Sequence, residues 1–372
     1  MNALGIIFSD IQDWSMTELA THRSVAAIPF GGRYRLIDFP LSNMVNSGVN
    51  KVCIITKSNY KSLMEHIGSG RDWDLSRKKG GILIFPPYAV GESYGLFHGR
   101  LDALKRVLDY IASSSERYVI ISDSDVIYNI NYKDVISYHI EKEADITALY
   151  IKTNINRDSS IHKIIYEFDE DNRANDVLVY PITSGKYNVG LSTWVMNKDF
   201  LEALIYDAIA RNYKDFSLDV LSRKVNHLKI YGYEYNGYYS HIDSLQSYYE
   251  DSMGLLKKEN LESLFYSKTG PIYTKTKDSA PTKYCKDANV KNSLIASGCI
   301  IEGTVENSII FRGVRIGKGA LVKNSIVISH GNVGENARID SIVMDTHAHV
   351  TNNRVLLGNS NCPFFIKRYS IV

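Results

Sequence analysis

A tripeptide of Asn or Asp, then Ser, then Leu or Ile recurs in the C-terminal part of the chain. Its four copies begin at Asn292, Asn307, Asn324 and Asp340, so they are 15, 17 and 16 residues apart. Between them, single apolar residues recur about five or six positions apart, at Val290, Ile295, Ile300, Val305, Ile310, Ile316, Leu321, Val327, Val333 and Ile339. A repeat of about sixteen, divided by roughly six, is typical of a parallel β-helix whose three faces each contribute one inward residue per coil. Each coil buries its apolar residues by stacking on the next, and a β-sandwich with evenly spaced strands is the alternative.

The chain up to about residue 255 follows another pattern, in which short apolar strands alternate with helical segments. We expect strands at Ala3–Phe8, Val52–Thr56, Ile82–Phe85, Tyr118–Ser122 and Asp145–Ile151, and helices at Tyr60–Ile67, Leu101–Ala112 and Tyr132–Lys142. Such alternation predicts βαβ units and a largely parallel sheet. Ligands of these sheets bind beyond the carboxyl ends of the strands. Asp125, just after the apolar run that begins at Tyr118, is expected at that edge.

A polar stretch separates the two patterns. Residues 256–286 contain two prolines among polar residues, which is typical of a linker that packs over the surface. The predicted organisation is therefore an α/β domain over 1–255, a linker over 256–286 and a β-helix over 287–372.

Composition excludes several classes of protein. The net charge of +2 gives no reason to expect a nucleic-acid or membrane surface, and no run of 18 apolar residues is present. The four cysteines have no metal-type spacing. The first residues lack a basic segment and are interpreted as a strand and not a signal peptide, so a cytoplasmic location is expected.

The stretch Ile28-Pro-Phe-Gly-Gly-Arg-Tyr-Arg-Leu-Ile-Asp-Phe-Pro-Leu-Ser-Asn43, followed by Asn46-Ser-Gly-Val-Asn-Lys-Val52, resembles the N-terminal region of ADP-glucose pyrophosphorylases. With the later segments and the repeat, the resemblance covers nearly the whole chain. It implies a nucleotidyltransferase-like α/β domain followed by a left-handed parallel β-helix of hexapeptide repeats. The reaction it implies is ATP plus glucose 1-phosphate giving ADP-glucose and pyrophosphate, in bacterial glycogen synthesis.

That reaction joins two polyanions, so it needs positive charge and positioning more than a protein nucleophile. The family has a glycine-rich phosphate loop after the first strand, whereas this chain has Phe8-Ser-Asp-Ile-Gln-Asp-Trp14, with two acids and no glycine. Val25 replaces the lysine of the family motif that follows. Tyr180 replaces the lysine that contacts the sugar phosphate.

The paired aspartates that hold Mg²⁺ in the family are also incomplete. Asp125 matches the first and is the one candidate metal ligand, but His241 takes the place of the second. Asp243 lies two residues further on, which on a strand moves the carboxylate by roughly 7 Å. No catalytic set is intact, and Asp125 is interpreted as a remnant.

The pattern resembles the regulatory subunits of this family in Gram-positive bacteria. The resemblance implies a chain with little or no activity of its own that assembles with a catalytic subunit, expected as a heterotetramer, and activates it. This chain would then require no cofactor, and Mg²⁺ and ATP are expected at the catalytic partner. An active sugar-phosphate nucleotidyltransferase with an altered site, using Asp125 with Asp243 or Asp123, is one alternative. An effector-binding scaffold without effect on catalysis is another.

Basic residues around the retained Pro-Phe-Gly-Gly loop are the candidates for binding an effector. In relatives, basic residues at the positions of Arg23 and Arg35 contact sugar-phosphate or nucleotide effectors, and Arg33 lies between them in sequence. The structural alternative for these arginines is an ion pair with Asp38 or a contact with a neighbouring subunit. Three histidines of the repeat, His330, His347 and His349, are interpreted as exposed at coil corners; a hexapeptide acyltransferase would use one histidine as general base.

Overall fold

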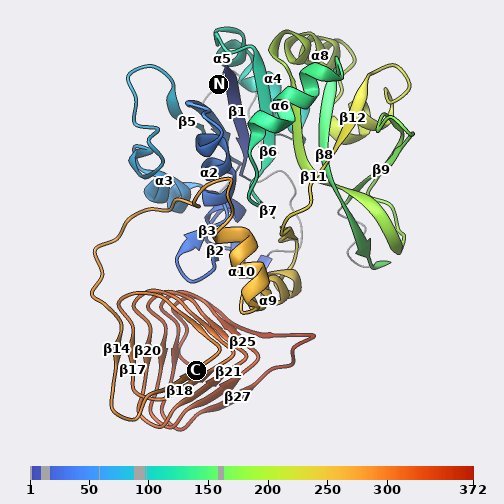
Figure 1. Ribbon diagram of the computed structural model, residues 1–372. Helices are drawn as coiled ribbons and strands as arrows, with labels where there is room; N and C mark the ends of the chain where they lie inside the picture. The colour runs from blue at the N-terminus through green and yellow to red at the C-terminus, as the bar shows by residue number, and fades with distance from the viewer. Residues whose placement is uncertain (1, 10–16, 58, 88–96, 98, 158–162) are drawn as a thin grey trace.

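The computed structural model describes residues 2–9, 17–57, 59–87, 97, 99–157 and 163–372. Figure 1 shows an α/β domain above a β-helix. A nine-stranded sheet forms the centre of the α/β domain, in the order β10-β9-β11-β6-β1-β4-β5, with β8 beside β11 and β12 beside β8. Its strands are β1 (Ala3–Phe8), β4 (Lys51–Ile55), β5 (Gly81–Phe85), β6 (Tyr118–Asp123), β8 (Ile146–Ile155), β9 (Ile164–Phe168), β10 (Ala174–Val179), β11 (Gly185–Asn197) and β12 (Ile230–Glu234).

Strands β5, β4, β1 and β6 pair in parallel, as the alternating pattern predicts, and β11 extends the sheet in antiparallel register. Alternate residues of β1 enter two separate apolar clusters, Leu4 and Ile6 in one and Ala3 and Ile7 in the other. The sheet is therefore covered on both faces, which is why its central strands are continuously apolar.

Helices of the α/β domain lie against the two faces of the sheet and, further along the chain, at the junction with the β-helix. They are α1 (Thr17–Ala20), α2 (Asp38–Asn46), α3 (Lys61–Ile67), α4 (Arg100–Arg106), α5 (Leu108–Ala112), α6 (Tyr132–Glu141), α8 (Lys198–Ala210), α9 (Leu245–Gly254) and α10 (Lys258–Phe265), with the short helical turns η1 (Val25–Ala27), η2 (Arg71–Trp73) and η3 (Ser217–Ser222). The single helix expected over residues 101–112 is two helices, since the chain breaks at Val107. Among the described residues, no helix is long and apolar enough to cross a membrane.

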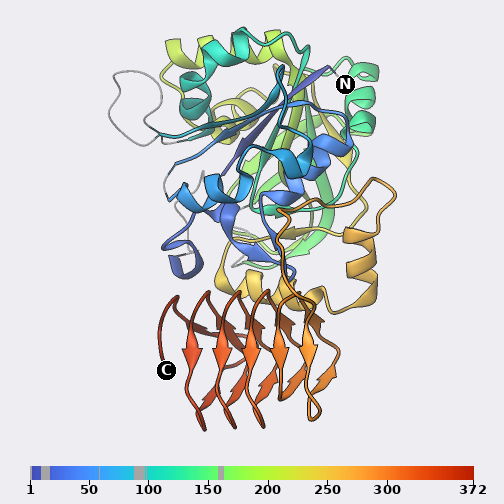
Figure 2. The ribbon, with the colours of Figure 1, turned by 90° about the vertical axis from the view of Figure 1, so that its left-hand side faces the viewer.

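The C-terminal domain is a left-handed β-helix of three parallel five-stranded sheets, drawn as stacked coils in Figures 1 and 2. One sheet contains β14 (Lys283–Tyr284), β17 (Ile300–Ile301), β20 (Arg315–Ile316), β23 (Asn332–Val333) and β26 (His349–Val350). The second contains β15 (Asn289–Lys291), β18 (Thr304–Glu306), β21 (Leu321–Lys323), β24 (Arg338–Asp340) and β27 (Val355–Leu357), and the third β16 (Leu294–Ile295), β19 (Ile309–Ile310), β22 (Ile326–Val327), β25 (Ile342–Met344) and β28 (Phe364–Ile366).

The geometry of one coil corner explains the Asn-Ser repeat. Asn292, Asn307 and Asn324 have positive φ angles of 42°, 45° and 44°, a conformation that asparagine tolerates better than most residues. The amide of Asn292 donates to Oδ1 of Asn307 in the next coil at 2.8 Å. Each following serine accepts from a backbone N–H of the next coil, as Ser308 Oγ does from Ser325 N at 3.1 Å. The repeat is thus a ladder of turn-forming and cross-linking side chains.

The two domains share an apolar cluster at their junction. Phe30 and Tyr248 of the α/β domain and Phe311 of the β-helix are buried in it. Helix α10 lies inside the segment predicted as a linker, and its Phe265 stacks on Tyr34 with ring centroids 4.8 Å apart. Strand β14 also begins within that segment. The polar composition of 256–286 concealed a helix because α10 buries only a narrow face.

Candidate functional site

Two charged regions stand out, and the first lies at the carboxyl edge of the parallel strands. Asp123 ends β6, and Asp125 follows it before the short strand β7 (Val126–Ile127). Arg100, at the start of α4, donates through Nε and Nη2 to the two carboxylate oxygens of Asp123. Arg100 is 2% exposed and Asp123 is 5% exposed, so the pair is buried. Asp123 is therefore already neutralised by the protein itself.

Asp125 is neutralised in a similar way. Strand β13 (Ser240–His241) pairs with β7, which puts Nε2 of His241 3.5 Å from Oδ2 of Asp125. The other ring nitrogen, Nδ1, contacts Nζ of Lys163 and lies 3.6 Å from Oδ2 of Asp243. Lys163 Nζ is also 3.4 Å from the same Asp243 oxygen. We call Asp125, Lys163, His241 and Asp243 the carboxylate cluster.

The pKa values in this region follow from burial and these contacts. Burial alone would raise the pKa of Asp125, but His241, Arg100 and Lys163 together bring it below its usual value. For Asp123, burial prevails over Arg100 and raises the pKa. Burial also lowers the pKa of Lys163, against the opposing charge of Asp243.

A divalent metal of the kind the resemblance implies does not fit this donor set. Mg²⁺ prefers carboxylate and other oxygen ligands, whereas an imidazole and an ammonium group lie beside Asp125 and Asp243. Within the described ranges, no group of three or more His, Cys, Asp or Glu side chains is arranged to hold a metal. From β13, the side chain that faces Asp125 is the imidazole of His241.

The other replaced positions lie in different surroundings. Tyr180 follows β10 with a φ of 56°, and its backbone N–H donates to the backbone oxygen of Lys163 at 2.9 Å. Burial raises the pKa of the Tyr180 hydroxyl, and the charge of Arg100 acts in the opposite direction. Val25 lies in η1 and packs on the apolar junction cluster. Of the loop that lacks glycine, residues 10–14 lie outside the described residues.

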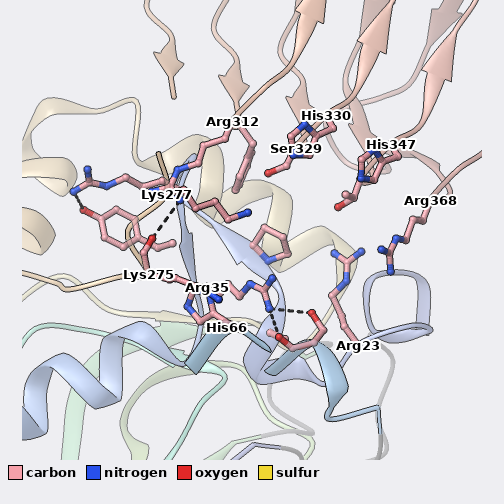
Figure 3. A pocket seen from close by; sticks show the side chains of 17 residues that line it. Arg23, Arg35, His66, Lys275, Lys277, Arg312, Ser329, His330, His347 and Arg368 are labelled. Atoms are coloured by element: carbon pink, nitrogen blue, oxygen red, sulfur yellow. Dashed lines mark hydrogen bonds between the residues drawn. The ribbon is translucent and has the colours of Figure 1, made fainter. Parts of the chain in front are cut away.

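The second charged region is a cavity of about 230 Å³ between the two domains. Seven Arg or Lys and three His side chains line it: Arg23, Arg33, Arg35, Lys275, Lys277, Arg312, Arg368, His66, His330 and His347. The described lining contains no Asp or Glu. Figure 3 shows Arg23 and Arg35 on the α/β side, facing Arg312, His330 and His347 of the β-helix. We call it the basic cavity.

All three arginines predicted as effector ligands line this cavity, each in a different environment. Arg23 is buried, and its Nη2 donates to both carboxylate oxygens of Asp345 in the β-helix at 2.7 and 2.9 Å. Arg35 donates through Nη1 to the backbone oxygen and hydroxyl of Ser62, at 2.6 and 2.9 Å. Arg33 is exposed and donates to the hydroxyl of Tyr34 at 2.8 Å.

The alternative of an ion pair with Asp38 holds only in part. Oδ2 of Asp38 accepts the backbone N–H of Arg35 at 3.0 Å, while Oδ1 lies 2.6 Å from Nε2 of His66. The carboxylate that pairs with Arg23 is Asp345, 322 residues away in sequence. The guanidinium of Arg35 keeps its donors directed to Ser62 and the cavity side.

Burial, together with neighbouring like charges, lowers several pKa values in the cavity. Burial lowers the pKa of Arg35 to about 10, and Arg23 and Arg368 act in the same direction. Burial, Arg35, Arg312 and Lys275 lower the pKa of Lys277. For His330, burial, His347 and Lys277 lower the pKa. Each shift disfavours the charged form, so the free cavity holds positive charge at an energetic cost that an anion would offset.

His330 and His347 are exposed at coil corners, as predicted, with positive φ angles of 60° and 58°. The prediction is wrong for His349, which begins strand β26 and is half-buried. Their rings stack with centroids 4.9 Å apart, and His347 stacks in turn on Tyr369 at 5.2 Å. The stack places imidazole edges along the wall of the basic cavity.

Sequence reasoning missed the partners in both regions. Lys163 and Arg100 carry no motif, and only the fold brings them to Asp125 and Asp123. Lys275 and Lys277 lie in the segment interpreted as a linker. The surplus of lysine between residues 268 and 286 was the one visible signal.

Comparison with known proteins agrees with this architecture. A protein-family model described as nucleotidyl transferase matches residues 16–258. A second family model, described as GlmU-like, C-terminal hexapeptide, matches residues 280–361. The glycogen biosynthesis protein GlgD of Bacillus subtilis is 38% identical over 85% of this chain and 81% of its own length. The GlgD of Geobacillus stearothermophilus is 37% identical, over 86% and 82% respectively.

An enzyme is nearly as similar. Glucose-1-phosphate adenylyltransferase of Clostridium perfringens (strain SM101) is 36% identical over 80% of this chain and 76% of its own length. The chain therefore belongs to the nucleotidyl transferase family, in the group that contains glucose-1-phosphate adenylyltransferases and GlgD glycogen biosynthesis proteins.

Proposed function

We propose that this chain is a regulatory subunit of glucose-1-phosphate adenylyltransferase that binds a catalytic subunit and raises its activity in glycogen biosynthesis. The observation that carries the proposal is the state of the carboxylate cluster. His241 and Lys163 neutralise Asp125 and Asp243 in the place where the reaction needs a metal and phosphates. A nucleotidyltransferase domain that keeps its fold and neutralises its own site retains a scaffold for assembly.

The chemistry of the reaction explains why such a site would turn over poorly. Transfer of a nucleotidyl group between polyanions depends on cations that neutralise developing charge. In this chain the cations nearest Asp123 and Asp125 are fixed in ion pairs. Mg²⁺ and ATP are accordingly proposed to act at the catalytic partner.

The basic cavity supports the regulatory part of the proposal. Its ten basic side chains suit a phosphorylated effector, either a sugar phosphate or a nucleotide, and arginine is well suited to forked phosphate contacts. Because the lining comes from both domains, a bound anion would favour one relative arrangement of them. That arrangement can change the affinity for the partner or the conformation of the partner, which is a coupling free energy between sites.

The remaining parts of the proposal concern assembly and location. We place the chain in a heterotetramer in the cytoplasm, where glycogen is made. The acyltransferase alternative has no geometric support, since the described contacts give neither His330 nor His347 the carboxylate that orients a catalytic base.

The test is the rate of ADP-glucose formation by the purified chain, by the catalytic subunit, and by their mixture. We expect almost no product from the chain alone and more product from the mixture than from the catalytic subunit alone. Turnover by the lone chain at a rate typical of such enzymes would support an altered active transferase instead. Effector binding to the chain without any change in the mixture would identify a scaffold.

A further inference from the structure

The carboxylate cluster contains a cation of the protein's own. Lys163, immediately before β9, is 8% exposed, and its ammonium group contacts both Nδ1 of His241 and Oδ2 of Asp243. The family motif has a carboxylate at the position of His241. The motif gives no reason to expect a buried lysine beside it, and Lys163 reaches His241 from a different part of the chain.

The contacts fix the roles of the groups. An ammonium has only donors, so Lys163 donates in its contact with Nδ1 of His241. Nε2, the other ring nitrogen, is 3.5 Å from Oδ2 of Asp125. The chain of contacts therefore runs from Lys163 through His241 to Asp125, with Asp243 paired directly to the ammonium at 3.4 Å.

We propose that Lys163 is an intramolecular replacement for the divalent cation of this site, and that its ammonium excludes Mg²⁺ from the space between Asp125 and Asp243. A metal between these carboxylates would lie against the ammonium, and like charges at such a distance repel strongly in a buried site. Displacing Lys163 would leave its ammonium buried without a partner, which adds a further penalty.

The proposal separates two reasons for the loss of metal binding. If the site lost its metal only because His241 replaced a carboxylate, then His241→Asp alone would restore binding. If Lys163 excludes the metal, the carboxylate introduced by His241→Asp pairs with the ammonium and binding stays absent. Only the double variant Lys163→Met/His241→Asp then presents carboxylates without a competing cation.

The experiment measures Mn²⁺ binding to the full-length chain by electron paramagnetic resonance, since free Mn²⁺ gives a signal that binding removes. We expect no saturable site near the cluster in the unmodified protein or in His241→Asp, and a new site in the double variant with affinity at least about tenfold higher. A matched control, Lys152→Met/His241→Asp, removes a surface lysine that pairs with Glu234 at 2.7 Å and should gain nothing.

The single variant keeps the proposal falsifiable if the double variant does not fold. Mn²⁺ binding by His241→Asp, lost again when Asp125→Asn is added, would overturn the internal-cation role. So would the same Asp125-dependent binding in the unmodified chain. Activation of a catalytic subunit is measured separately, by the rate of ADP-glucose formation in the mixture, so failure of this proposal and failure of the regulatory function are distinguishable.

Discussion

The two charged regions of this protein differ in how their charges are balanced. In the carboxylate cluster and the adjoining Arg100–Asp123 pair, each carboxylate lies beside a basic side chain from another element of the same domain. In the basic cavity, seven Arg or Lys side chains from both domains face a lining with no described carboxylate. In the first region the carboxylates have partners within the protein. In the second region basic side chains are in excess, and a bound anion would reduce their mutual repulsion. The difference favours anion binding at the domain junction over metal binding at the sheet edge.

The largest effect is expected from unbalancing the neutralised region. Arg100→Met leaves Asp123 buried without its partner, and breaking one half of a buried pair costs about 3–5 kcal/mol. Urea unfolding monitored by circular dichroism should show this loss in the free energy of unfolding. The control is Arg211→Met, whose pair with Asp207 is exposed and whose removal should change the free energy of unfolding little. An equal loss of unfolding free energy in the two variants would show that burial does not make the Arg100–Asp123 pair more important than an exposed pair.

Removing a charge from the basic cavity is expected to change stability less, and in the opposite direction. Lys277→Met removes one of several repelling cations, so the free protein should be unchanged or slightly more stable. Its affinity for fructose 1,6-bisphosphate should fall about tenfold, since hydrogen bonds to charged groups contribute about 1.5–3 kcal/mol. Isothermal titration calorimetry measures the change. Lys258→Met, which removes an exposed lysine on α10, serves as the control. A Lys277 variant that is less stable and binds as tightly would contradict the idea of an unbalanced cavity.

The smallest effect is a pH dependence of anion binding. Burial, His347 and Lys277 hold the pKa of His330 below 6.5, so this ring is largely neutral at neutral pH. A bound anion offsets the repulsion and raises that pKa, so binding takes up a proton and affinity rises as the pH falls toward the pKa of His330.

Sulfate is the probe for this prediction, because its own charge is constant over the range. We expect a few-fold tighter binding of sulfate at about pH 6 than at about pH 8, and a flatter profile in His330→Asn. Asparagine keeps the positive φ of 60° at this corner accessible. An identical slope in the variant would assign the proton to another group.

Sequence alone predicted those features whose signal is local. The Asn-Ser repeat identified the β-helix because each coil must place a turn residue and an inward residue at the same offsets. The apolar strands of the parallel sheet were visible for the same reason, and the boundaries of β1, β4 and α3 differ from the prediction by at most one residue. Arg23, Arg33 and Arg35 were found through a motif.

Features that depend on contacts between distant segments were not visible. Arg23 pairs with Asp345 across 322 residues, and Lys163 meets His241 across 78. The polar, proline-containing segment 256–286 was interpreted as a linker, yet it contributes helix α10 and two lysines of the basic cavity. A charge acquires a partner only when the fold places another group beside it, and no spacing rule in one sequence specifies that.

We propose that this chain acts on a catalytic partner without using its own sheet-edge site. The most direct test is ADP-glucose formation by the catalytic subunit mixed with the Asp125→Asn variant, compared with the same mixture made with the unmodified chain. Asparagine keeps the shape of the side chain and removes the charge that a metal would require. We expect the two mixtures to form ADP-glucose at the same rate, which means that the variant activates the catalytic subunit as well as the unmodified chain does. A rate in the variant mixture reduced to that of the catalytic subunit alone would show that Asp125 takes part in the chemistry, and would contradict the account.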